Sequence, residues 1–587
     1  MPPKTDTASW PWSLAWPLPA GQRLATLGAW VATGLILLVA PFERVDSPIA
    51  LPGQTITNAE AATLVALAIW IGSSLVGRRL PAWRSPLAWP ALALVAGVAV
   101  AAAAAPAEQA NAFRTVGRIA AGLFVCLLAA DAGRWRDGVP ALMRIAVAAG
   151  GFVGVVALLE VLDVPIVVGW LAHFRESAHV VGGQLRATST LQYPTITSMY
   201  LEVVFAMALG VLVLEIDRGR ARAAGFVFVA AAIIAEGVVL TLTRAGLVTV
   251  ALSLAIVAAG LIARRGLDRA ARAVVALAFV VSILAGGTLG LRSSWLRFTT
   301  DGQEGWYRAT FDAPVSLRLA TGVMTRVPLT VRNDGRATWR TEADPSFRLS
   351  HHWLDAKGAQ VVVFDGLRSA FPQDVPPGGQ TTVDAWVQAP PVPGRYLIAW
   401  DIVLEKRLWF GTETPLTTLT AVEVSGDAVG TLPPPLPGMP LAEVRLGRLT
   451  LWGIALRMIA ARPLAGFGPD NFRLLHGEFA GIDRADARVH TNNMYLELLV
   501  GAGLVGGLPL VWLLWRIVSA MGRAWPRVGR DALPVFLGLA AAVAAVLAHG
   551  LLDSFLTFTP TYLVIWTSFG LAAAWAASTG EPRADRV

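Results

Sequence analysis

The residues of this chain that could do chemistry are arginines and a histidine at the edges of apolar runs. Arg244 lies in Thr241-Leu-Thr-Arg-Ala-Gly246, between two apolar runs with almost no loop. Arg448 lies in a segment whose apolar residues recur at helical spacing, and His490 shortly precedes another apolar run. The arginine guanidinium stays charged and binds phosphate through two N–H groups, whereas histidine exchanges a proton near neutral pH. Together these residue types suit a reaction that stabilises a phosphate group and removes a proton.

The composition indicates which elements must position these residues. Apolar residues make up 55% of the 587 residues and charged residues only 15%, whereas a soluble domain carries roughly 25% charge. The apolar residues come in blocks of about 20, the length of a membrane-spanning helix. A purely soluble enzyme, a disordered chain and a fibrous protein are therefore excluded. A transmembrane β-barrel is excluded because its strands would alternate apolar and polar residues over about 10 positions.

The expected fold is an all-α polytopic membrane protein with about twelve transmembrane helices. The apolar runs lie at about 22–40, 59–77, 87–105, 115–130, 140–162, 195–214, 223–242, 245–263, 273–291, 495–515, 532–552 and 559–577. Nine of them fall in an N-terminal membrane part, 1–291, and three in a C-terminal one, 494–587. The loops after the even-numbered runs hold 16 arginines, against 5 in the short loops on the other side. Basic loops stay in the cytoplasm, so both termini are expected there.

One outward segment, from about 292 to 493, is long enough for a soluble domain. Within 312–425, short runs rich in β-branched and aromatic residues alternate with turn sequences. About seven such strands predict an inserted immunoglobulin-like β-sandwich. A Pro-rich spacer completes the insertion at 292–440. The segment 441–493 is expected to form an amphipathic helix along the membrane surface, followed by a polar loop.

The order of several motifs points to a family. They are Thr241 to Gly246, Arg448 through Trp452 to Pro463-Leu-Ala-Gly-Phe-Gly468, His490 to Gly506 and, more weakly, Arg186-Ala-Thr-Ser-Thr-Leu-Gln-Tyr-Pro194. Over about 180–520 the chain resembles the O-antigen ligase / polysaccharide polymerase superfamily of membrane glycosyltransferases. The resemblance implies transfer of a glycan from a polyprenyl (undecaprenyl) diphosphate to an acceptor hydroxyl, at the periplasmic face of the bacterial inner membrane. It implies no metal, cofactor or nucleotide, and makes the β-sandwich an insertion.

The resemblance also implies roles for individual residues. Arg244 and Arg448 would hold the diphosphate, and His490 would act as the base. The candidates for substrate binding are Arg186, Asn492, Asn493, Glu497 and Trp409, of which Trp409 lies among cations near a predicted hairpin tip of the sandwich. The family's histidine usually stands at the position of Asn492. Either His490 reaches the same place in a different register, or the two asparagines bind sugar and base assistance is weaker.

Other polar residues of the predicted spans are open to two interpretations. His549 and Asp553 lie near the outer end of a predicted span and could line the same cavity. Glu160, Glu202 and Glu236 could instead be polar contacts inside the bundle.

Several functions stay open at the level of sequence. A ligase would pass the glycan to a glycan, lipid or protein acceptor, whereas a polymerase would extend it on the carrier. A transporter would show paired halves with broken helices and midplane charges, but the sequence has no internal repeat and the arginines gather at the outer surface. A non-enzymatic assembly protein would not explain that gathering. The net charge of +8 agrees with basic cytoplasmic loops, so the expected partner is the lipid bilayer and not nucleic acid.

Overall fold

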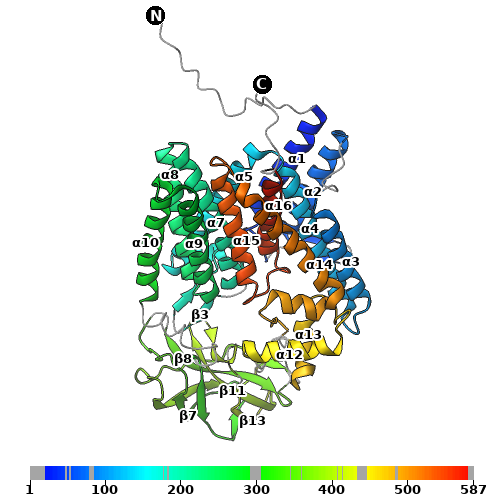
Figure 1. The fold of residues 1–587 in the computed structure, drawn as a ribbon. Helices are drawn as coiled ribbons and strands as arrows, with labels where there is room; N and C mark the ends of the chain where they lie inside the picture. Colours follow the sequence, from blue (N-terminus) through cyan, green and yellow to red (C-terminus); the bar gives the residue numbers. More distant parts are fainter. Residues whose placement is uncertain are drawn as a thin grey trace, which may run out of the picture.

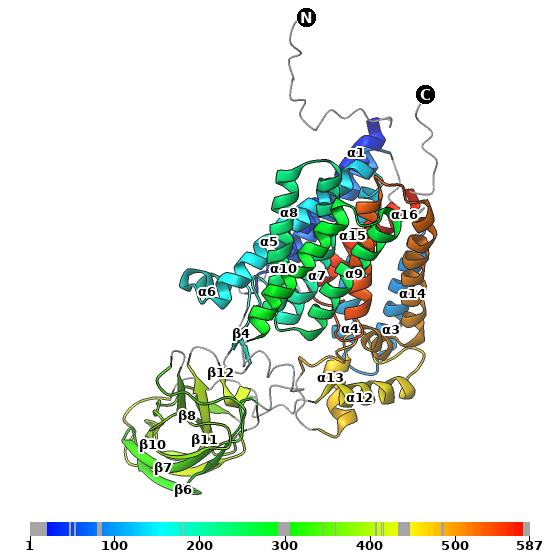
Figure 2. The same ribbon diagram turned by 60° about the vertical axis from the view of Figure 1, so that its left-hand side comes forward.

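The computed structural model describes residues 20–45, 49–51, 54–78, 85–175, 178–181, 184–290, 306–343, 346–358, 360–405, 408–412, 414, 416–432, 446–482 and 487–578. The helices form one bundle, and a strand-rich unit lies at one end of it (Figure 1). We call residues 306–432 the β domain, and the end of the bundle that faces them the β-domain end. α1 begins and α16 ends at the opposite end (Figure 2).

Ten helices of the described residues are long and apolar enough to cross a membrane. They are α1 (Ala20–Val39), α2 (Asn58–Val76), α4 (Gln109–Ala132), α5 (Val139–Val161), α7 (Pro194–Asp217), α8 (Ala221–Leu240), α9 (Arg244–Arg265), α10 (Arg269–Leu289), α14 (Met494–Ala524) and α16 (Thr559–Ser578). Two further apolar helices are shorter, α3 (Ala88–Ala103) and α15 (Leu533–His549). The multi-pass membrane fold is thus confirmed. All twelve predicted runs are helical, and ten of them have the length of a span.

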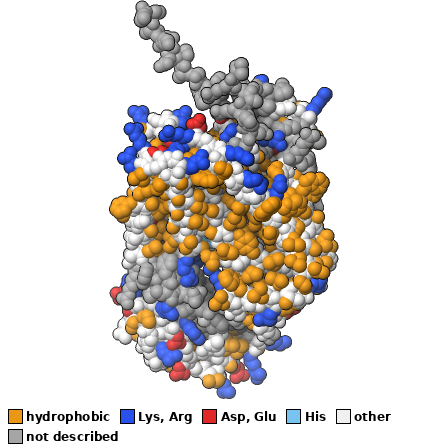
Figure 3. Space-filling model, in the orientation of Figure 1, with side chains coloured by type: hydrophobic (Ala, Val, Ile, Leu, Met, Phe, Trp, Pro, Cys, Tyr) orange, Lys and Arg blue, Asp and Glu red, His pale blue; other side chains and the backbone are white. Residues whose placement is uncertain are grey.

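The bundle is organised around α7, whose residues are nearly all buried. α15 packs closely along it, because both helices carry a glycine at the contact. A methyl group on Gly210 would lie 3.0 Å from the Cα atom of Gly538. Small residues at such a crossing let two backbones approach, which strengthens packing inside a membrane. Outside this core, hydrophobic side chains form a broad band, and Lys and Arg gather at the end opposite the β domain (Figure 3).

The β domain consists of two sheets that share one hydrophobic core. The first contains β5 (Ala309–Asp312), β7 (Met324–Asn333) and β10 (Gln380–Gln388), in the order β10-β7-β5. The second contains β6 (Ser316–Ala320), β13 (Leu419–Ser425), β11 (Gly394–Leu404), β8 (Phe347–Asp355) and β9 (Val361–Val363), in that order, with β12 (Leu408–Trp409) on β11. The predicted β-rich segment is therefore a sheet region. The Pro-rich spacer lies almost entirely outside the described residues.

Small elements connect the bundle to the β domain. The antiparallel hairpin of β3 (His179–Val181) and β4 (Gln184–Arg186) rises from the bundle, and its Leu185 joins the hydrophobic core of the β domain. The helix predicted in the segment 441–493 is α12 (Arg448–Ala461), which crosses the β-domain end and is followed by α13 (Phe472–Ala480) (Figures 1 and 2). The hairpin β1 (Ile49–Leu51) and β2 (Gln54–Ile56) and the short α6 (Pro165–Leu171) complete the described α-helices and strands.

Candidate active site

Arg186 is joined by direct hydrogen bonds to the turn before α9. Its buried guanidinium donates from Nε to the Thr241 carbonyl at 2.9 Å and from Nη2 to Thr243 Oγ1 at 3.4 Å. Thr241 Oγ1 also donates to Thr243 Oγ1 at 2.9 Å. Leu242 between them has a φ of +51°, which is strained for a bulky residue and needs such support. The structure therefore brings the Arg186 motif and the Arg244 motif together.

The turn delivers Arg244 as the first residue of α9, where its side chain is half-buried. The first N–H groups of a helix have no partners within the helix, and the helix dipole adds partial positive charge there. An arginine at this position strengthens a place that already attracts anions such as phosphate. Arg186 has a different role, because its guanidinium is hydrogen-bonded to the backbone of this turn and holds it in place.

A buried carboxylate anchors the segment that follows Arg186. Glu160 of α5 accepts hydrogen bonds from the N–H groups of Ser189 at 2.6 Å and Thr188 at 3.0 Å, and it also pairs with Arg175. All four residues are buried. Glu160 is thus a polar contact within the bundle, and Arg175 neutralises it.

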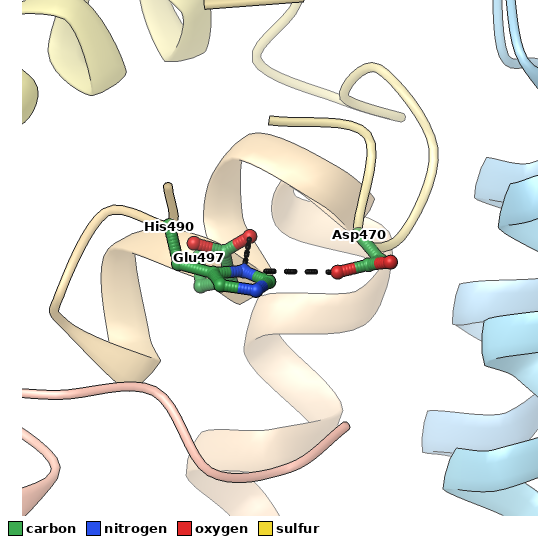
Figure 4. A group of neighbouring side chains, drawn as sticks. All are labelled: Asp470, His490 and Glu497. Atoms are coloured by element: carbon green, nitrogen blue, oxygen red, sulfur yellow. Dashed lines mark hydrogen bonds and ion pairs between the residues drawn. The ribbon is translucent and has the colours of Figure 1, made fainter. Parts of the chain in front are cut away.

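His490 lies in the loop before α14, between two carboxylates. Its Nδ1 is 3.3 Å from Glu497 Oε1 and 3.7 Å from Asp470 Oδ1 (Figure 4). Carboxylate oxygens accept hydrogen bonds, so Nδ1 carries a proton and Nε2 is left to accept one. Burial alone would lower the pKa of His490, but the negative charges of Glu497 and Asp470 outweigh burial and raise this pKa above its ordinary value.

Asn493 builds the start of α14. Its Oδ1 accepts hydrogen bonds from the N–H groups of Tyr495 and Leu496, each at 3.0 Å, as expected of an N-cap residue. Its Nδ2 donates to the Leu551 carbonyl at 3.0 Å, which ties the loop to the end of α15. The amide that we predicted to bind substrate is therefore engaged in positioning the loop.

The first turn of α14 then directs Glu497 back to the loop. The Thr491 N–H donates to Glu497 Oε2 at 2.8 Å, while the other carboxylate oxygen faces His490. Asn492, at the position of the family's usual histidine, is half-buried and has a φ of +51°. The turn at Asn492 leads into α14, whose Glu497 orients His490.

α12 brings Arg448 to the His490 loop. Arg448 is exposed at the first position of α12, and Trp452 one turn later donates its Nε1–H to the Thr491 carbonyl at 3.0 Å. Arg448 is also near enough to His549, at the end of α15, for the two charges to interact. Two of the predicted catalytic residues therefore lie around one loop.

The His490 loop lies within the part of the chain that matches a known family model. Residues 441–511 match the family model described as O-antigen ligase. The predicted resemblance to the O-antigen ligase family is thereby confirmed. The match, which we call the ligase-family segment, contains Arg448, Asp470, His490 and Glu497. It supports a ligase- or polymerase-like membrane function. A search of the curated proteins found no match to this chain.

Trp409 lies apart from the ligase-family segment, in the β domain. Its half-buried ring is 4.6 Å from the His352 ring and 5.4 Å from the Phe364 ring, and the Arg368 guanidinium lies over it at 4.6 Å. The neighbouring cations predicted from the sequence, at 406 and 407, lie outside the described residues. Trp409 thus packs against residues of its own domain, so it is less open than an exposed sugar platform would be.

Two functional candidates escaped the sequence interpretation. Asp470 lies two residues beyond the Pro463-to-Gly468 motif, and its carboxylate also accepts from Arg473 Nε at 2.8 Å. The second is a pair in which His549 Nδ1 lies 2.8 Å from Glu202 Oε2. Glu202 and His549 were each noticed, but 347 positions separate them. Only the packing of α15 on α7 reveals that they are partners.

Asp470, His490 and Glu497 could also be considered as metal ligands, since one ligand atom of each lies within 4.8 Å of the others. The described residues, however, already supply partners for both carboxylates. Arg473 pairs with Asp470, and His490 Nδ1–H and the Thr491 N–H donate to Glu497. The same arrangement can therefore take up a proton at His490 and hold it, which is what a general base requires.

Proposed function

We propose that this protein is a membrane glycosyltransferase of the O-antigen ligase type. It would transfer a glycan from a polyprenyl (undecaprenyl) diphosphate to an acceptor hydroxyl without a metal. The observation that carries the proposal is the contact between Trp452 and Thr491, because it assembles Arg448 and His490 of the ligase-family segment around one loop.

The chemistry follows from the charges of these residues. The acceptor oxygen attacks the anomeric carbon, and the bond between that carbon and the diphosphate oxygen breaks. The electron pair of that bond stays on the diphosphate, where Arg244 and Arg448 stabilise the added negative charge. The acceptor proton passes to Nε2 of His490, and Glu497 and Asp470 stabilise the imidazolium that results.

The same proposal fixes the orientation in the bacterial inner membrane. The end rich in Lys and Arg would lie in the cytoplasm, with the start of α1 and the end of α16. All twelve apolar helices would span, with α3 and α15 as the short members. The β domain would be periplasmic. We regard it as immunoglobulin-like because the Tyr396 hydroxyl donates to the Val392 carbonyl at 3.0 Å, four residues upstream, like the tyrosine corner of such sandwiches.

A deletion strain tests the function when carrier-linked glycan and finished surface polymer are measured together. Accumulation of long carrier-linked glycan supports a ligase, and restoration by the wild-type gene but not by His490→Ala would link it to this site. Accumulation of single unpolymerised units would make the protein a polymerase. Unchanged glycans in the deletion strain would contradict both enzymes.

Cysteine labelling in intact spheroplasts tests the orientation. A cysteine at Gly378, in the β domain, should react with an impermeant thiol reagent, and one at Gly529, between α14 and α15, should not. The native Cys126 is buried and gives little background. Reversed labelling would overturn the orientation.

A further inference from the structure

Beside the His490 loop lies a second histidine–carboxylate pair, inside the bundle. His549 Nδ1 is 3.0 Å and 2.8 Å from the two carboxylate oxygens of Glu202, and Ser198 Oγ donates to the same carboxylate at 2.5 Å. All three side chains are buried. The two carboxylate oxygens and the fixed imidazole make this pair a rigid unit between α7 and α15.

The other nitrogen of this imidazole is not accounted for by the protein. His549 Nε2 is buried and has no hydrogen-bond partner among the described residues. Buried polar atoms are nearly always hydrogen-bonded, because leaving one without a partner is unfavourable. An imidazole oriented by a carboxylate and open at Nε2 is prepared for a partner from outside the protein.

The surroundings of this imidazole select the charge of that partner. Glu202 lies against Nδ1, and Asp553 is a second acidic neighbour whose influence exceeds that of the cation Arg448. A protonated imidazole beside these carboxylates presents a positively charged Nε2–H, which suits an anion. The motif that carries Arg244 touches the pair from the other side. A methyl group on Gly246 would lie 2.2 Å from Ser198 Oγ and 3.0 Å from the Glu202 carboxylate. The element that carries Arg244, one of the two diphosphate-binding arginines of the proposed function, thus meets this pair.

We propose that His549 Nε2–H binds an oxygen of the carrier's diphosphate, with Glu202 positioning the imidazole. This inference rests on the proposed function and adds a third cationic group to the donor site. When the bond between sugar and diphosphate breaks, the electron pair stays on the diphosphate. His549 keeps its proton and donates a hydrogen bond, so the acceptor proton still goes to His490. Phe555, whose ring centroid is 4.8 Å from that of His549, is the side chain that the bound diphosphate displaces.

Two isosteric variants test this binding in the full-length protein in lipid nanodiscs. His549→Asn keeps an N–H donor beside Glu202 but has no atom at the place of Nε2. His549→Gln places an N–H group at that position. Affinity for undecaprenyl diphosphate should fall about 10-fold in His549→Asn and less in His549→Gln. Affinity for undecaprenol, which has no phosphate, should stay the same. Equal diphosphate affinity in His549→Asn and the wild type would overturn the proposal.

A structure of the wild-type protein with undecaprenyl diphosphate serves if a variant fails to fold. A diphosphate oxygen within about 3.2 Å of His549 Nε2 supports the proposal. A diphosphate bound by the arginines while Phe555 still covers His549 overturns it. Glycan transfer by the wild type tests the proposed function separately, because diphosphate binding at His549 can be measured whether or not transfer occurs.

Discussion

The two histidine–carboxylate pairs of this protein differ in where they lie. His490 stands between Glu497 and Asp470 in a loop and is partly exposed, whereas His549 meets Glu202 inside the bundle, where it is buried and its Nε2 has no partner among the described residues. An imidazole between carboxylates is suited to take up a proton. An imidazole held by a carboxylate inside the bundle, beside the element that carries Arg244, is suited to meet an anion through its other nitrogen. The comparison teaches that position divides the work between two similar side chains: the acidic, proton-accepting side lies in the loop, and the cationic side lies at the pair inside the bundle.

The cationic side of this comparison is tested most strongly by Arg244→Ala. We expect glycan transfer to fall by about 100- to 1000-fold, because charge on the departing diphosphate loses a stabilising group. Turnover should fall more than donor binding, since that charge grows as the bond breaks. Arg244→Lys should recover part of the rate, because lysine keeps the positive charge but lacks the two parallel N–H donors of the guanidinium. Steady-state kinetics of purified protein in liposomes provides the measurement.

The matched control for Arg244 is Arg269→Ala. Arg269 is likewise the first residue of a long apolar helix, α10, but it lies at the opposite end of the bundle. This variant should transfer glycan at the wild-type rate. A stably inserted Arg244→Ala protein with full activity would refute the cationic role.

The acidic side is tested by His490→Ala, for which we expect a loss of about 100-fold, the lower range for a general base. The pH profile should change with it. Because the pKa of His490 is raised, the wild-type rate should increase with pH through a value above the ordinary one of about 6.5. Below that value His490 is protonated and cannot accept a proton. The alanine variant should lack this limb, and an unchanged pH profile would exclude His490 as the base.

Glu497→Gln sharpens the comparison by altering only the charge beside His490. Removing the nearer carboxylate should lower the pKa of His490 and move the rising limb of the pH profile to lower pH, by about one unit. Asp470→Asn should move it less, because Asp470 is farther from the imidazole and is already paired with Arg473. Both variants need only rate measurements over about four pH units around the histidine pKa of about 6.5. If the pH profiles of both variants rise at the same pH as the wild-type profile, these charges do not act on His490.

The smallest effect should come from Leu185→Ala, outside both pairs. Leu185 packs into the core of the β domain, while the next residue, Arg186, binds the turn before α9. Loosening this hairpin should slow transfer by less than about 10-fold through misplacement of Arg244. Leu185→Met should restore the rate, and Val331→Ala, a cavity elsewhere in the β-domain core, serves as control. Equal loss in Leu185→Ala and Val331→Ala would indicate a general weakening of the β domain.

The sequence predicts the parts of this architecture that depend on short stretches of chain. Apolar runs set the twelve helices, alternating residues set the main strands, and the loop from His490 to Glu497 is close enough in sequence to be treated as one motif. Asn493 could have been assigned from its place before a helix, where asparagine is a preferred N-cap. Instead, the family resemblance led us to expect substrate binding there.

Other features depend on contacts that no local pattern encodes. The strands β3 and β4 have three residues each, which is too few for a periodic signal. The hairpin that carries Arg186 was therefore not predicted. The pairing of Glu202 with His549 requires knowledge of which helices are neighbours, and the sequence does not order helices in space. Gly210 and Gly538 allow the two backbones to approach closely only because α7 and α15 lie side by side, and no local pattern shows that they do.

The distance along the chain between Glu202 and His549 has a consequence for biosynthesis. At about 5–20 residues per second, the 347 residues that separate them take roughly 17 to 70 s to synthesise. During that interval α7 is made but α15 is not, and Ser198, four residues away on the same helix, is the local partner for the carboxylate. A lone carboxylate in a bilayer avoids its charge by binding a proton. We therefore expect Glu202 to stay protonated until α15 brings His549 beside it, so that the packing of α15 on α7 would also complete the charge pattern inside the bundle.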